Sequence, residues 1–146
     1  MNHNLLHNLS PSSRLPTDVI FDVFPSSSSP VQIHAHKCFL ADGSDVFDKM
    51  FYQDGAPKET TDKVTVRVEN IEEEIFIKFL NHVYGEKVVV DELIGIESVM
   101  QMLLLVEKYN IKDMKEALLL RMKSQVVDEE NFIGIVKQVE KLSSRQ

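Results

Sequence analysis

The sequence has 146 residues, of which 43% are hydrophobic and 27% are charged, a balance typical of one ordinary globular domain and not of a disordered chain. Sixteen Lys and Arg residues against 23 Asp and Glu residues give a net charge of −7. Such a surface repels a phosphate backbone, so we expect no direct binding of nucleic acid. A single cysteine excludes an internal disulfide and suits a reducing compartment.

The N-terminal stretch, MNHNLLHNLS, has neither the cationic start nor the continuous apolar run of a secretory signal. No apolar run in the chain is long enough to span a membrane. We therefore expect an intracellular chain, in the cytoplasm or the nucleus, with no membrane partner. Leu5, Leu6 and Leu9 fall at i, i+1 and i+4 and form an apolar edge. Because so short a segment cannot hold a helix alone in water, residues 1–16 are either a helix that lies on another surface or an unfolded terminus.

Two strands and a third, separate strand are predicted from alternating side chains. Over residues 19–24 and 31–36, two sets of side chains alternate along the chain and would point to opposite faces of a strand. This is the pattern of a half-buried strand. The PSSSSP stretch between them is turn chemistry, so the two strands are predicted to form a hairpin. The stretch KVTVRVEN alternates valines with polar residues in the same way.

Helices are predicted over most of the remaining chain. Ser44 is expected to cap a short helix. Asn70 is expected to cap a longer helix that stops at Gly85. The stretch KVVVDE is predicted to be a short extended piece, and helices follow near 97–110, 112–125 and 129–142. The residues on the apolar helix faces are predicted core residues: Phe47, Phe76, Phe79, Leu80, Leu104 and Leu118. Strands first and helices later indicate an α+β fold, with helices grouped around a small sheet.

The stretch VQIHAHKCF places His34, His36 and Cys38 at a spacing of two, which raises the question of a metal site or a Cys–His nucleophile. Zinc needs three or four ligands with a supporting shell, and no CxxC or HxxxH set occurs elsewhere. No rule puts the base within hydrogen-bond reach of the sulfur, and neither a glycine-rich phosphate loop nor GxSxG occurs. We therefore expect no catalytic, cofactor-binding or metal-ligating residue, no cofactor and no enzyme activity. His36 is predicted to be structural, and Cys38 to be buried and inert.

Three stretches, TDVIFDV, IHAHKCFLADGSDVFDKMF and VTVRVENIEEEIFIKFLNHVYGE, together resemble a BTB/POZ domain. MLLLVEKYNIKDMKEALLLRMKSQV is similar to the next two helices of that family, and VVDEENFIGIVKQVEKL to the helical extension that often follows. The resemblance implies a BTB/POZ fold, a small three-stranded sheet flanked by five to six helices. It places the domain at residues 17–125 and the start of a BACK/3-box-like extension at 126–146. Gly43 departs from the family pattern and is expected to cost about 1 kcal/mol.

The resemblance implies an interaction module that pairs with itself or with another BTB protein. The dimer interface that it implies consists of Leu5, Leu6, Leu9, Asp18 and Lys37. Asp18 and Lys37 match a charged pocket at the dimer face of transcription-factor members of the family. The alternative is that Asp18 only caps or pairs locally.

The resemblance also implies an adaptor for a cullin-3 ubiquitin ligase. The implied cullin contact consists of Met50, Phe51, Tyr52, Pro57 and Glu59, although the apolar-x-Glu motif of family adaptors is degraded here. The chain has no room for a MATH, kelch or zinc-finger domain, so we expect a BTB-only protein or the BTB portion of a longer adaptor. The alternatives are a Skp1- or elongin C-like scaffold subunit, a channel tetramerisation domain of related fold, and a regulator of larger BTB proteins that does not bind cullin.

Overall fold

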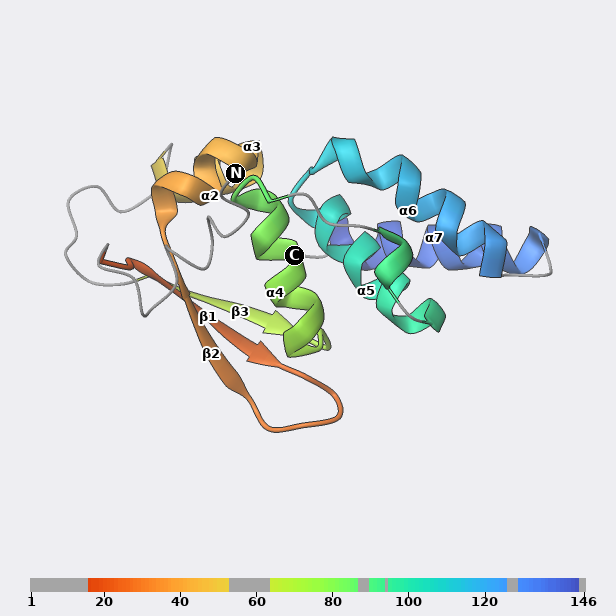
Figure 1. Cartoon of the computed structure of the whole chain (residues 1–146), viewed down its shortest axis with the longest axis horizontal. Helices are drawn as coiled ribbons and strands as arrows, with labels where there is room; N and C mark the ends of the chain where they lie inside the picture. Colours follow the sequence, from red (N-terminus) through yellow and green to blue (C-terminus); the bar gives the residue numbers. More distant parts are fainter. Residues whose placement is uncertain (1–15, 53–63, 87–89, 94, 126–128, 145–146) are drawn as a thin grey trace. The chain divides into compact units, whose positions relative to one another are not determined.

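The computed structural model describes residues 16–52, 64–86, 90–93, 95–125 and 129–144 (Figure 1). The chain divides into two compact units, Met1–Val88 and Val89–Gln146. Leu5, Leu6, Leu9, Pro57 and Glu59 lie outside the described residues. Within the described part of the chain, every helix is too short or too polar to cross a lipid bilayer.

The first unit contains a three-stranded sheet of β1 (Val19–Phe24), β2 (Val31–Ala35) and β3 (Val64–Glu69). The strand order is β2-β1-β3, with β1 antiparallel to β2 and parallel to β3. The predicted hairpin, the predicted third strand and the α+β class are therefore confirmed. Because β1 lies in the centre, its side chains decide which face of the sheet carries the core.

One face of β1 is buried and aromatic. Successive side chains of a strand point to opposite faces, and Val19, Phe21 and Val23 are all fully buried. The ring of Phe21 lies edge-on to Phe76, with centroids 4.9 Å apart, and edge-on to Phe47 at 6.0 Å. Edge-to-face pairs at these separations stabilise a core beyond the area that they bury. The helices of the first unit are thus held on this face of the sheet.

Those helices are α2 (Lys37–Gly43), α3 (Asp45–Tyr52) and α4 (Glu73–Val83), and Figure 1 shows α4 lying along the sheet. Ser44 caps α3 as predicted, because its hydroxyl accepts the N–H of Phe47 at 3.2 Å. Ser44 is also the residue that follows the end of α2, so α3 begins directly after α2. The two short helices therefore form one continuous corner of the unit.

The predicted cap of α4 at Asn70 is wrong. Asn70 has a φ of 62° and its N–H is bonded to the carbonyl of Phe24 at 2.9 Å, so it turns the chain out of β3. Asparagine tolerates this left-handed conformation better than most residues. The residue that precedes α4 is Glu72. The predicted end of the helix is confirmed, since Gly85 has a φ of 105° just beyond the last turn.

The second unit begins with η1, a short 3-10 helix at Val90–Glu92. The prediction of an extended piece is therefore wrong for these residues. The N–H of Leu93 bonds to the carbonyl of Val90 at 3.0 Å, and the Leu93 side chain is buried. One apolar anchor that closes a single tight turn outweighs the extended preference of Val90.

Three helices follow, α5 (Gly95–Lys108), α6 (Lys112–Gln125) and α7 (Glu129–Ser144), close to their predicted ranges. α5 contacts both of the others. Phe47, Phe76, Phe79, Leu80 and Leu118 are buried as predicted. Leu104 is only half-buried, so its place in the predicted core is wrong. The helix turns about 100° per residue, which puts Leu104 on the side opposite the buried Met102 and Val106.

Candidate functional site

His36, at the junction of β2 and α2, is a structural residue, as predicted. It is 3% exposed, its main-chain N–H donates to the hydroxyl of Tyr84 at 2.8 Å, and its Nδ1 lies 2.7 Å from the same oxygen. The hydroxyl satisfies both groups when it accepts the amide proton and donates its own to Nδ1, which leaves the ring proton on Nε2. Burial raises the pKa of Tyr84 well above its ordinary value, so the hydroxyl keeps this proton.

The other two members of the His34, His36 and Cys38 stretch lie in different surroundings. His34 is half-buried, with its Nδ1 3.5 Å from the hydroxyl of Thr17. Cys38 is exposed, so the prediction of a buried thiol is wrong. The first turn of α2 buries Lys37 and Leu40, and Cys38 falls on another side of the helix. Among the residues that the structure describes, no three His, Cys, Asp or Glu side chains are grouped to hold a metal ion.

Asp18 ties three elements of the first unit together. Its main-chain N–H donates to the carbonyl of Ala35 at 3.0 Å, and its carbonyl accepts the N–H of Val64 at 3.1 Å. Its Oδ1 accepts the N–H of Lys37, the first residue of α2, at 2.8 Å. A carboxylate at this position satisfies an otherwise open amide and complements the helix dipole. The local capping role, one of the two alternatives from the sequence, is thus present.

Lys37 itself lies close to Asp18 but is 7% exposed. The structure therefore brings the two predicted dimer residues together through the main chain of Lys37. Their part in a dimer face remains a prediction.

The three predicted cullin residues on α3 differ strongly in exposure. Phe51 is buried and stacks on Phe47 with centroids 5.7 Å apart, so it supports the helix from inside. Met50 is half-buried. Tyr52 is 54% exposed and presents the aromatic ring. Of the three, Tyr52 offers a partner the largest accessible apolar group.

The Tyr52 hydroxyl has a perturbed pKa. Its pKa is raised, first by partial burial and then by the charges of Asp18, Cys38 and Asp48. A negative field of this kind disfavours the phenolate. We call the exposed ring of Tyr52 at the end of α3 the Tyr52 surface. Tyrosine is an amphipathic side chain of the kind favoured at the centres of protein interfaces.

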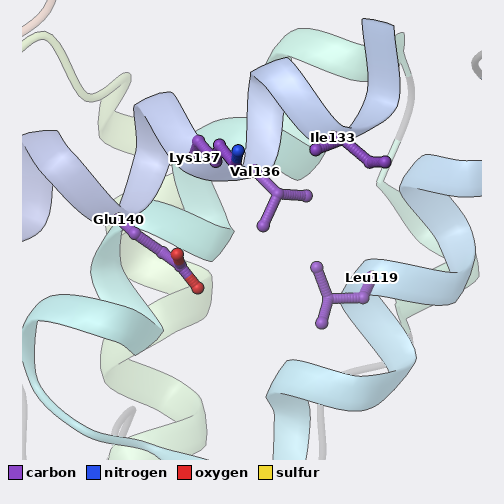
Figure 2. Close-up of a pocket in the computed structure, with 5 residues that line it drawn as sticks. All are labelled: Leu119, Ile133, Val136, Lys137 and Glu140. Carbon is purple, nitrogen blue, oxygen red and sulfur yellow. The ribbon is translucent and has the colours of Figure 1, made fainter. Parts of the chain in front are cut away.

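A second candidate surface, missed from the sequence, is an open groove in the second unit. It has a volume of about 290 Å³, and its lining residues come from α6 and α7: Leu119, Ile133, Val136, Lys137 and Glu140. Figure 2 shows Leu119 of α6 and Val136 of α7 on opposite sides of it. Val139, three residues after Val136 on the same side of α7, is buried, so the groove lies at the edge of the apolar face of this helix. The spacing of Ile133 and Val136 was the signal that could have revealed it.

The fold consists of a small mixed sheet with helices on its buried face in one unit, and of helices in the second unit. A profile of the family described as BTB/POZ domain matches residues 10–125, and the chain belongs to this family. BTB domains are generally protein–protein interaction modules.

A solved structure supports the fold. The chain is similar to the BTB domain of zebrafish PATZ1, with a TM-score of 0.57 and 20% sequence identity. The match covers 84% of this chain and 87% of the other. At this identity the likeness shows the fold alone. A search of curated proteins found no match.

Proposed function

We propose that this BTB/POZ chain is an adaptor that binds cullin-3 through the Tyr52 surface. The observation that carries the proposal is the exposed ring of Tyr52 at the end of α3. Met50 lies two residues before it, and Pro57 and Glu59, which lie outside the described residues, complete the proposed contact. Tyrosine is enriched among the few interface residues that dominate binding energy, because it buries a large area at the cost of two side-chain torsions.

Titration calorimetry with the N-terminal domain of cullin-3 tests this contact. We expect the wild-type chain to bind and Tyr52→Ala to bind at least tenfold more weakly, since truncation of such a residue costs about 2 kcal/mol. Ile77→Ala is the matched control, because Ile77 is 38% exposed on α4 of the same unit. Its affinity should stay within twofold. Absence of binding by the wild type, or equal binding by Tyr52→Ala, would contradict the proposal.

We further propose that the chain acts as a dimer with its own copy or with another BTB protein. The proposed interface joins the segment that contains Leu5, Leu6 and Leu9 to the Asp18–Lys37 corner. Support comes from the hydrogen bond that fixes this corner and from the three leucines. Each buried leucine would contribute about 1.5–3 kcal/mol before the cost of ordering the segment is subtracted. In a two-fold dimer the same patch meets its own copy.

Sedimentation at micromolar concentration tests the dimer. We expect the wild-type chain to sediment as a dimer and a chain lacking residues 1–10 to sediment as a monomer. Leu120→Ser is the control, because Leu120 is a 66% exposed leucine of α6 outside the proposed interface. If the wild-type chain alone sediments as a monomer, the homodimer is excluded and only a dimer with another BTB protein is left. A chain that pairs with other BTB proteins but does not bind cullin-3 would be a regulator of larger relatives instead.

A further inference from the structure

The β1–β2 loop, residues 25–30, carries four consecutive serines between two prolines. All four serines are exposed. The first two are held by Glu72, the residue that precedes α4: its carboxylate accepts the N–H and the hydroxyl of Ser26, both at 3.2 Å, and the hydroxyl of Ser27 at 2.6 Å. These bonds, that from Ser27 first, hold the pKa of Glu72 below its ordinary value. The start of the loop is thus anchored to the start of α4.

The second half of the loop is different. The hydroxyls of Ser28 and Ser29 make no hydrogen bond to another residue that the structure describes. Ser29 also precedes Pro30, whose ring lacks an N–H and biases the preceding residue towards an extended backbone. Ser29 lies in neither a helix nor a strand, and only Pro30 separates it from the start of β2. It therefore combines an exposed hydroxyl with a following proline, which favours an extended backbone at the acceptor.

We propose that Ser29 is a phosphorylation site for a proline-directed protein kinase. Protein kinases bind their substrates as extended chain, and this class has a pocket for the residue after the acceptor that selects proline. The Oγ of Ser29 forms a new bond to the γ-phosphorus of ATP, the bond from that phosphorus to the β-phosphate oxygen breaks, and ADP leaves. The hydroxyl proton passes to the carboxylate base of the kinase. Ser26, Ser27 and Ser28 lack the following proline.

The modification places its charge where the fold is already acidic. A phosphoserine carries about −1.5 to −2 charges at pH 7. Ser29 is two residues from Ser27, whose hydroxyl holds the Glu72 carboxylate, and Glu73 and Glu74 follow in the first turn of α4. A new anion at this edge repels these carboxylates. Phosphorylation would therefore act on the contact between the hairpin loop and α4, away from the Tyr52 surface.

The test uses the full chain with Ser10→Ala, because Ser10–Pro11 is the other serine or threonine followed by proline in the sequence. The chain is incubated with a mitogen-activated kinase and Mg–ATP, and the phosphate is located by mass spectrometry of peptides. We expect one phosphate, at Ser29. The initial rate should fall at least tenfold with Pro30→Ala and to background with Ser29→Ala. Ser28→Ala is the matched control, with a rate within twofold.

A synthetic peptide of residues 21–35 completes the test. Phosphorylation of the peptide but not of the folded chain would show that the loop does not present Ser29, and would overturn the proposal. Failure of both would show that the sequence is not a substrate, with the same consequence. Phosphate on Ser26, Ser27 or Ser28 in place of Ser29 would also overturn it.

Discussion

Replacement of Gly43 by alanine would test how closely α2 and α4 approach each other. A Cβ on Gly43 would lie 2.5 Å from the carbonyl oxygen of Val83 and 2.8 Å from its Cγ1. The oxygen belongs to the main chain of α4 and cannot rotate away as a side chain can, so the helices would have to separate. Overpacking of this kind costs about 1–3 kcal/mol, whereas loss of a helical glycine normally gains about 0.5–1 kcal/mol. Gly43 is the last residue of α2, so the gain is at the low end of that range and we expect a net loss of about 0.5–2.5 kcal/mol.

Urea titration followed by circular dichroism measures the free energy of unfolding of both variants. Gly134→Ala is the matched control, because Gly134 is an exposed glycine of α7 and no atom lies within 4 Å of the added Cβ. It should gain about 0.5–1 kcal/mol. A Gly43→Ala chain as stable as the wild type would refute the close approach. The departure from the family pattern at Gly43 would then cost only the helix propensity that was expected from the sequence.

The tyrosines and the Glu72 carboxylate give three further measurements. Tyr84→Phe removes the hydroxyl of the strand-to-helix junction and should lower the free energy of unfolding in urea by about 1–3 kcal/mol, while Tyr52→Phe should change it by less than about 0.5 kcal/mol. Ser27→Ala removes the main cause of the lowered pKa of Glu72, so an NMR titration should show that pKa rising towards its ordinary value; an unchanged pKa would contradict the 2.6 Å bond. Burial raises the pKa of Tyr109 to about 12, above the unfolded value of about 10, so its contribution to stability is full below pH 10 and is lost as the pH rises towards 12. Ionisation of Tyr109 near pH 10 in the folded chain, followed by NMR, would argue against its burial.

Features of the fold that depend on local chemistry were predictable from the sequence. The alternation in β1 and β3 follows from the two-residue period of a strand. The cap at Ser44 and the stop at Gly85 follow from the backbone groups that a helix leaves open. The same logic failed at Asn70, because asparagine suits a cap and a left-handed turn equally well. The turn out of β3 decided between them.

The contacts that hold the junction of β2 and α2 were not predictable, because they join distant parts of the chain. The hydroxyl of Tyr84 reaches His36 across 48 residues, and the carboxylate of Asp18 reaches Lys37 across 19. Pairs of this kind leave no periodic pattern of apolar residues in the sequence. Phe51 and Tyr52 were both predicted as cullin contacts, and only the stacking of Phe51 on Phe47 separated a core ring from the exposed one at Tyr52.

The mixed sheet also orders the events of folding. β1 and β2 are joined by a short loop, and a hairpin of this kind closes within about 1–10 μs. β3 pairs in parallel with the other edge of β1, and Val19 meets Val64 only after the intervening chain has been brought round. Because that closure entropy is lost before the pairing rewards it, we expect β3 to join last. Until then β1 has an open edge on a newly made chain, which is where the edge of another chain could pair wrongly.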